Sequence, residues 1–463
     1  METQYAETQH VKTRILLDLS HTYFSHHRTG IQRVVRSLLT EIPRVTGELE
    51  IEFAAIVLKD NEFVYVDSLK QDETVAPSAP LLDVLGKCPK WYPPMAKIAC
   101  SIVRSNVLKR WLLPEPGHQG IFRHVRKFQK ADSTPEKATS DSNPIRVRFT
   151  PNDFIVMPDG YWVMMHIWEA VARAKSQGAR VGVVVHDLIC FTHPHFFSPG
   201  AKECFTKYLL ALNEHADMAI ATTQTVEKQL RGTLAQLATD LRRPPECKHF
   251  RLGVTIENPD GEVRDSISTL FAGREKPYLM VSTFEPRKNH KFVLDSFDVF
   301  WKRYSTRKLL FVGAVGWMSD AMLQRIKSHP RFGSQLLMVN DASDAEVQHC
   351  YVNCAAAIYP SFVEGFGLPI IEALRNHKTV FASNTPVHRE VGKQYCEYVD
   401  LSDENSLVAS MESWERSGRP SPSPHMEQLL KSWNESARQL VYRVLDFAEG
   451  QECPTDSKRA VAI

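Results

Sequence analysis

Short apolar runs alternate with amphipathic stretches along most of the chain. The first run, RILLDLS from Arg14, precedes a turn-like segment HTYFSHHRTG and then IQRVVRSLLTEI, where apolar residues recur at helical spacing. Further strand-like runs begin at Ile51, Phe154, Arg180 and Met218. The helical stretches YWVMMHIWEAVARAKSQ and AKECFTKYLLALNEHA separate the later runs. This alternation is typical of a parallel α/β sheet.

A second series of the same kind follows the polar segment ENPDGEVRDS. It contains the strand-like runs KPYLMVS, KLLFVG, QLLMVN, AAAIYPSF and TVFAS, with helices predicted at KFVLDSFDVFWKRY, DAEVQHCYVNC and LPIIEALRN. The sequence therefore predicts two α/β domains, at 14–258 and 259–424, with a candidate site in the cleft between them. We expect flexible segments at 1–13 and 450–463, and a helix over 425–449 whose apolar stripe packs on a core.

Composition narrows the class of protein without selecting a partner. The 463 residues are 43% hydrophobic and 24% charged, with 56 Lys and Arg against 54 Asp and Glu, which excludes a disordered chain and gives no reason to expect nucleic acid. The nine cysteines show no C-x-x-C spacing, and the opening METQYAETQH lacks the order of a signal peptide. We therefore expect reduced thiols and a cytoplasmic location.

One insertion, over about 87–145, differs from the rest of the chain. The segment from Lys87 to Lys130 contains ten basic residues and a single acidic residue, Glu115, and aromatic residues are interleaved with them. Such a segment can contact an anionic membrane surface or a phosphorylated lipid carrier, and a solvated insertion is the alternative. The sequence leaves both interpretations open.

The most informative motif is YPSFVEGFGLPIIEAL. Glu364 lies in a Gly-rich loop after a predicted strand, and Glu372 lies one turn into the helix that Leu368 opens. The glycines allow close approach of the backbone to a ligand, and the start of the helix favours an anion. A carboxylate in the loop can accept hydrogen bonds from sugar hydroxyls, and one on the helix can hold ribose hydroxyls. The pattern suits a nucleotide-sugar.

Three other places bring polar groups to the carboxyl ends of predicted strands, where ligands of open α/β sheets bind. Arg287 and Lys288 suit a diphosphate, with solvated residues at a helix start as the alternative. Gly30 can lend backbone N–H groups to a phosphate, with plain turn chemistry as the alternative. His186 can contact a sugar, with a core histidine or a helix cap by Asp187 as the alternative.

Together, TGIQRV, HDL, FEPRKNH and PSFVEGFGLPIIEA resemble family 4 of the retaining glycosyltransferases, whose B-type (GT-B) fold has two Rossmann-like domains facing across a cleft. The resemblance covers most of 14–448 and is strongest from Tyr278 to Val399. The start DLSHTYF to TGIQRVVRSLL is similar to bacterial enzymes that build O-antigens and other surface polysaccharides, frequently mannosyl- or rhamnosyltransferases.

The resemblance implies a catalytic role for four residues. These four are His186, Arg287, Lys288 and Glu364. Gly30 would bind the donor by contacting its diphosphate from the first domain. His186 would touch the donor sugar near the reacting carbon. Arg287 and Lys288 would hold the diphosphate, and Glu364 would bind the hydroxyls of the sugar.

It also implies a donor-binding role for the loop and helix that follow Glu364. Gly365, Phe366, Gly367 and Leu368 would contact the sugar and phosphate through backbone N–H groups, and Glu372 would bind the ribose. The terminal helix at 425–449 would cross back onto the first domain.

The implied activity is retaining transfer of a hexosyl group from a nucleotide-diphosphate sugar to a glycan or lipid-linked acceptor in cell-surface polysaccharide biosynthesis. We expect mannose from GDP-mannose first, with rhamnose, glucose or galactose as alternatives. No D-x-D motif occurs, so we expect no obligatory metal and no cofactor besides the donor. We expect a cytoplasmic protein, with peripheral contact to the inner face of the membrane if the basic insertion binds lipid and none if it is a solvated insertion. A catalytically silent homologue that acts as a binding module is the alternative. A dinucleotide-dependent enzyme would need G-x-G-x-x-G, and GAVG at Gly313 lacks it.

Overall fold

The computed structural model describes residues 13–24, 29–67, 69, 144–238, 243–255, 259 and 261–450. Every helix and strand given below belongs to the unit formed by 1–67 and 146–463. The predicted basic insertion lies outside the described residues except for its last two positions, and the predicted flexible termini lie outside them except for one residue each. Among the helices that the structure describes, none is long and apolar enough to span a membrane.

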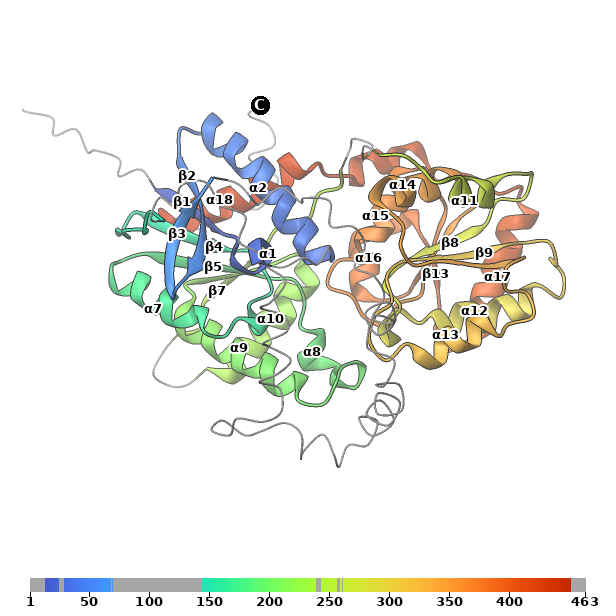
Figure 1. The fold of residues 1–463 in the computed structure, drawn as a ribbon, viewed down its shortest axis with the longest axis horizontal. Coiled ribbons are helices and arrows are strands. Elements are labelled where there is room, and N and C mark those ends of the chain that lie inside the picture. The colour runs from blue at the N-terminus through green and yellow to red at the C-terminus, as the bar shows by residue number, and fades with distance from the viewer. Residues whose placement is uncertain are drawn as a thin grey trace, which may run out of the picture. The chain divides into compact units, whose positions relative to one another are not determined.

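The N-terminal half contains a seven-stranded sheet in the order β3-β2-β1-β4-β5-β6-β7 (Figure 1). Its strands are β1 (Arg14–Asp18), β2 (Glu52–Lys59), β3 (Glu62–Val66), β4 (Asp153–Met157), β5 (Arg180–Val185), β6 (Met218–Ala221) and β7 (Glu246–His249). Neighbouring strands pair in parallel except β2 and β3. Asp60 and Asn61 turn that hairpin with φ of 50° and 64°, which short polar side chains tolerate. The sequence prediction missed β3 and β7.

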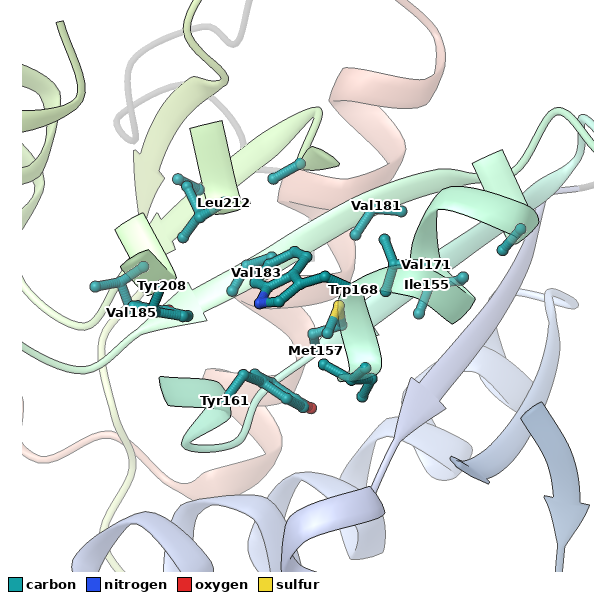
Figure 2. Close-up of a cluster of buried hydrophobic side chains, with 14 of the residues drawn as sticks. Ile155, Met157, Tyr161, Trp168, Val171, Val181, Val183, Val185, Tyr208 and Leu212 are labelled. Carbon is teal, nitrogen blue, oxygen red and sulfur yellow. The ribbon is translucent and has the colours of Figure 1, made fainter. Parts of the chain in front are cut away.

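The helices of this half connect successive strands. They are α1 (Ser20–Phe24), α2 (Gly30–Glu48), α7 (Ile167–Ser176), α8 (Ile189–Thr192), α9 (Ala201–His215) and α10 (Gln224–Leu237), with 3-10 turns η1 (Tyr161–Val163) and η2 (Pro194–Phe196). Every second residue of β4 and β5 points to one face of the sheet: Ile155, Met157, Val181, Val183 and Val185. Trp168 of α7 and Tyr208 of α9 pack on this face and are 4% and 1% exposed (Figure 2). This core fixes the carboxyl ends of the strands.

The C-terminal half contains a six-stranded, all-parallel sheet in the order β10-β9-β8-β11-β12-β13. Its strands are β8 (Tyr278–Val281), β9 (Leu309–Val312), β10 (Leu336–Val339), β11 (Ala357–Tyr359), β12 (Val380–Ser383) and β13 (Glu397–Val399). Its helices are α11 (Asp265–Ser268), α12 (His290–Phe300), α13 (Asp320–Lys327), α14 (Asp344–Asn353), α15 (Leu368–Arg375), α16 (Pro386–Gly392) and α17 (Glu404–Arg416), with the 3-10 turn η4 (Pro286–Lys288). The predicted α/β architecture of two parallel-sheet domains is confirmed.

The last helix, α18 (Trp433–Ala448), begins later than the sequence prediction of 425–449. Ser432 caps the start of α18, because its hydroxyl accepts a hydrogen bond from the Glu435 N–H while the Glu435 carboxylate accepts one from the Ser432 N–H. The segment before it forms a 3-10 turn, η6 (Pro424–Leu429). The predicted return to the first domain is confirmed, since α18 packs against α2 (Figure 1) and Asn434 donates to Glu41.

Candidate functional site

The strand order of the second sheet reverses between β8 and β11, so the loops after these two strands meet at a topological switch point. Arg287 and Lys288 lie in η4 after β8, and Glu364 lies in the loop after β11. The N–H of Phe362 donates to the carbonyl oxygen of Arg287 at 2.9 Å and ties the two loops together. Open α/β sheets bind their ligands at such a point. The structure thus brings three of the predicted site residues together.

Glu364 is held by two cations. Its Oε2 accepts a hydrogen bond from Arg287 Nη1 at 2.7 Å, and its Oε1 accepts one from Lys288 Nζ at 2.5 Å. The three side chains are only 10–16% exposed, which strengthens the attraction between their charges. Burial acts to raise the pKa of Glu364, but the two cations outweigh it and hold this pKa well below its usual range. Burial lowers the pKa of Lys288. Glu364 therefore stays ionised and keeps both cations in place.

A second carboxylate, Glu285, completes this cluster and was missed by sequence reasoning. Its Oε1 accepts from Arg287 Nη2 at 2.7 Å, while its buried Oε2 has no hydrogen-bond partner among the described residues. Burial raises the pKa of Glu285. The residue lies two positions before Arg287 in FEPRKNH, and this position within the motif could have indicated that it belongs to the site. With Arg287, Lys288 and Glu364 it makes a cluster of two acids and two bases.

Glu372 has its carboxylate engaged on both oxygens. Its Oε1 accepts from Arg33 Nη2 at 2.6 Å, and its Oε2 accepts from the Tyr351 hydroxyl at 2.9 Å. Arg33 is on α2, in the N-terminal half, and the charge of Glu372 raises its pKa. Sequence reasoning quoted TGIQRV but gave Arg33 no role, because a partner 339 positions away leaves no local signal. A ribose at Glu372 would have to share the carboxylate with Arg33.

Two glycines of the loop allow close packing. A Cβ on Gly365 would lie 2.1 Å from the carbonyl oxygen of His186, so only glycine fits there. Gly367 has a φ of 92° at the start of α15, and a Cβ on it would lie 3.4 Å from the ring of His388. His388, on α16, was also missed. Phe366, between the glycines, is 6% exposed and is therefore mostly core.

His186 follows β5 and is buried. Its Nε2 lies 2.8 Å from the carbonyl oxygen of Pro158, and burial lowers its pKa, which favours a neutral ring that donates from Nε2. The neighbouring Asp187 accepts from the N–H of Ile189, the first residue of α8. The N-cap position of α8 is Leu188, which makes no capping hydrogen bond with its side chain, so Asp187 contacts the helix start from one position before the cap. A contact between His186 and a sugar stays a prediction.

The first sheet has its own switch point, between β1 and β4, with acids that the sequence prediction did not select. Asp159 accepts from the Thr22 N–H at 2.6 Å and lies 3.0 Å from His21 Nδ1. The hydrogen bond to Asp159 raises the pKa of His21. Asp18 is fully buried, its Oδ2 has no partner among the described residues, and burial raises its pKa to about 7. This edge therefore carries one buried acid, Asp18, whose pKa is raised to near neutral pH.

Gly30 and Leu368 each open a helix. Gly30 starts α2 three residues before Arg33, and the space beside its Cα is open. Leu368 starts α15, where Pro369 has no N–H and the Ile370 N–H donates to the carbonyl oxygen of Gly367 at 3.0 Å, so Leu368 supplies the amide at this helix start. Both positions therefore present backbone N–H groups of the kind that bind phosphate.

A pocket of about 310 Å³ reaches this site, and Asp187, His193, Lys228, Val363 and Glu364 are among its lining residues. In the part of the chain that the structure describes, no group of three or more His, Cys, Asp or Glu side chains is arranged to hold a metal ion.

Comparison with known proteins finds a family model that matches part of the second half of the chain. Residues 264–439 match the family model for glycosyl transferases group 1. The serotype-specific mannosyltransferase WbdA of Escherichia coli is 27% identical over 306 residues, covering 64% of this chain and 37% of that protein. O-antigen chain mannosyltransferase B of Escherichia coli is 30% identical over 132 residues, covering 28% and 34%. The chain thus spans little more than a third of the length of these relatives.

Two solved structures share the fold over nearly the whole chain. Sucrose-phosphate synthase from Thermosynechococcus elongatus superposes with a TM-score of 0.56 at 17% identity, covering 94% of this chain and 100% of that one. Anabaena HepE, solved in complex with UDP and glucose, gives a TM-score of 0.50 at 12% identity, covering 95% and 98%. The two parallel sheets are the two Rossmann-like domains of the GT-B fold.

Proposed function

Because the chain carries a glycosyl transferases group 1 domain in a GT-B fold, we propose that it is a retaining glycosyltransferase. It moves a mannosyl group from GDP-mannose to a glycan or lipid-linked acceptor of a cell-surface polysaccharide. The observation that carries the proposal is the pairing of Arg287 and Lys288 with Glu364 at the switch point of the second sheet. The names of the matched Escherichia coli proteins support mannose and O-antigen.

Arg287 and Lys288 neutralise the leaving diphosphate. The bond between the anomeric carbon and the diphosphate oxygen breaks, and the acceptor oxygen bonds to the same face of that carbon. The acceptor proton passes to the departing phosphate. Negative charge grows on the phosphate during this step, so positioned cations in a mostly buried site stabilise the transition state more than the bound donor.

The remaining groups bind and orient the donor. Glu364 accepts hydrogen bonds from the hydroxyls of the sugar. The hydroxyls of the ribose replace Arg33 as hydrogen-bond donors to Glu372. The backbone amides at the starts of α2 and α15 contact the phosphates, as helix N-termini do elsewhere. The carbonyl oxygen of His186 lies against Gly365, and we propose that this residue contacts the sugar from the first domain. Since cations and amides supply the positive charge, we propose transfer without an obligatory metal or other cofactor.

Transfer from a panel of donors tests this function. The purified chain is incubated with GDP-mannose, dTDP-rhamnose, UDP-glucose or UDP-galactose and with manno-oligosaccharide acceptors, with and without EDTA. We expect transfer from GDP-mannose that EDTA leaves unchanged, and a product with the anomeric configuration of the donor by NMR. Nucleotide binding without any product would instead favour a silent binding module, and transfer that EDTA abolishes would contradict metal independence.

The segment from Lys87 to Lys130 is proposed to contact anionic membrane or a lipid-linked acceptor. A variant that lacks it should lose sedimentation with vesicles containing phosphatidylglycerol while keeping its affinity for GDP. Equal sedimentation of the two proteins would contradict membrane contact through this segment.

A further inference from the structure

Four aromatic rings form a rigid surface beside the candidate site, which we call the aromatic ledge: Phe196, Phe197, Trp317 and Phe362. Phe196 stacks on Phe362 with ring centroids 5.6 Å apart, and Phe197 stacks on Trp317 at 5.6 Å. Trp317 Nε1 also donates to the carbonyl oxygen of Phe196 at 2.7 Å. Although these contacts fix the rings, Trp317 and Phe362 remain 42% and 45% exposed. The ledge therefore presents apolar surface at fixed positions.

The four ledge residues do not line the pocket that reaches Glu364, but they adjoin residues that do. Phe362 directly precedes Val363 and Glu364, which both line that pocket. On the other side, the ring of His193, another lining residue, stacks on Phe196 at 6.2 Å. A ligand that rests on Phe362 is therefore next to the carboxylate that the donor sugar is proposed to use.

The lining of the pocket matches a neutral, hydroxyl-rich ligand. Hydroxyl and amide side chains are among the lining residues, from Thr192, Gln229, Thr233 and Gln236. Lys228 is the cationic side chain among the lining residues, since burial lowers the pKa of His193. Such groups hydrogen-bond sugar hydroxyls, while the polarised C–H faces of a sugar pack on the electron-rich faces of aromatic rings. A lipid phosphate would favour more positive charge.

We propose that the aromatic ledge and this pocket form the acceptor subsite, which binds the terminal sugars of a neutral glycan with their C–H faces on Trp317 and Phe362. The proposal rests on the proposed function, because it needs a donor at the switch point. It adds the class of the acceptor and the residues that hold it. The acceptor hydroxyl then enters from the side of the pocket that Glu364 and Asp187 line.

The stacked pairs also join the two halves of the chain, so the alternative explanation of these rings is a purely structural contact between the halves, a clasp. The two explanations differ in what the loss of one ring changes. Loss of a clasp alters stability and donor affinity together, whereas loss of a glycan contact alters acceptor binding alone. Kinetics with separate donor and acceptor titrations can therefore decide between them.

The experiment compares Trp317→Ala and Phe362→Ala with the wild type. We expect each to raise the acceptor KM for manno-oligosaccharides roughly two- to tenfold, with kcat and the GDP dissociation constant unchanged. Trp317→Phe and Phe362→Tyr should restore most of the loss. Phe332→Ala is the matched control, because Phe332 is another exposed ring, 40% accessible, that belongs neither to the aromatic ledge nor to the pocket lining.

A direct measurement keeps the acceptor proposal separate from the proposed function. Saturation-transfer NMR with mannotriose and GDP should show glycan binding to the wild type and its loss in Phe362→Ala, even if no transfer is found. The proposal is overturned if the wild type shows no glycan binding, if the alanine variants bind mannotriose normally, or if they change only stability and GDP affinity. Absence of GDP binding in the wild type would instead contradict the proposed function.

Discussion

The two sheets both reverse their strand order, and the two switch points differ in their electrostatics. At the second, Glu364 and Glu285 are paired with Arg287 and Lys288, so that four buried charges balance. At the first, Asp18 is hydrogen-bonded to Ser20 but forms no ion pair among the described residues, and burial raises its pKa to about 7. Glu285 at the second switch point also has an unpartnered oxygen and a pKa raised by burial, but it is paired with Arg287.

This difference suggests a division of labour between the domains. A switch point with fixed, balanced charges can exchange its internal ion pairs for a diphosphate without proton uptake. A switch point with a group that titrates near neutral pH, such as Asp18, makes stability depend on pH. We therefore expect the donor charge to be handled by the second domain and most of the pH dependence of folding to come from the first.

The largest expected effect comes from breaking the balanced cluster. Glu364→Gln removes the counter-charge of Lys288 while leaving its ammonium 12% exposed. Loss of one partner of a buried ion pair costs about 3–5 kcal/mol of unfolding free energy, measured by urea denaturation at pH 7. Lys291→Ala, which breaks an exposed pair with Asp295, is the control and should cost less than about 0.5 kcal/mol. Equal stability of Glu364→Gln and the wild type would contradict the account.

A smaller effect should appear at the first switch point. Because the folded pKa of Asp18 lies above its unfolded value of 3.8, the unfolded state loses the proton first, and stability falls as pH rises from about 4 to about 7. Asp18→Asn should reduce the change in unfolding free energy across this pH range by up to about 4 kcal/mol. Melting temperatures from pH 4.5 to 8 measure it, with Asp60→Asn in the exposed hairpin turn as the control. An unchanged slope in Asp18→Asn would show that Asp18 does not titrate in this range.

A still smaller effect, on the affinity for GDP, is expected where Arg33 of the first domain contacts Glu372 of the second. Glu372→Gln weakens the proposed ribose contact and should raise the dissociation constant of GDP about tenfold, the equivalent of one charged hydrogen bond. Arg33→Met leaves Glu372 available and should bind GDP at least as well as the wild type. Isothermal titration calorimetry measures both, with the exposed Glu449→Gln as the control. Wild-type affinity in Glu372→Gln would remove Glu372 from the donor site.

The sequence predicted the second domain better than the first. Its first five strands are short apolar runs with a helix or a polar loop between them, and the motif residues Arg287, Lys288 and Glu364 follow two adjacent strands. Strand β3 was missed because it belongs to a hairpin, which breaks the strand-helix alternation. The start of α18 was missed because the apolar stripe continues through Leu429 and Leu430 across the capping Ser432.

What the sequence could not show is which groups pair across the chain. Arg33 and Glu372 lie 339 positions apart, so neither has a local pattern that indicates the other. Asp18 follows an apolar run like any strand end, and its burial depends on the packing around it. Glu285 was visible inside a motif, but its pairing with Arg287 depends on the conformation of η4.

The most direct test of the central claim separates turnover from donor binding in Arg287→Ala and Lys288→Ala. GDP-mannose affinity comes from calorimetry and kcat from the transfer assay, both with EDTA present, and circular dichroism confirms folding. If these cations stabilise the departing diphosphate, kcat should fall about 10²–10³-fold while the dissociation constant changes far less. A folded Arg287→Ala enzyme with unchanged turnover would contradict the account.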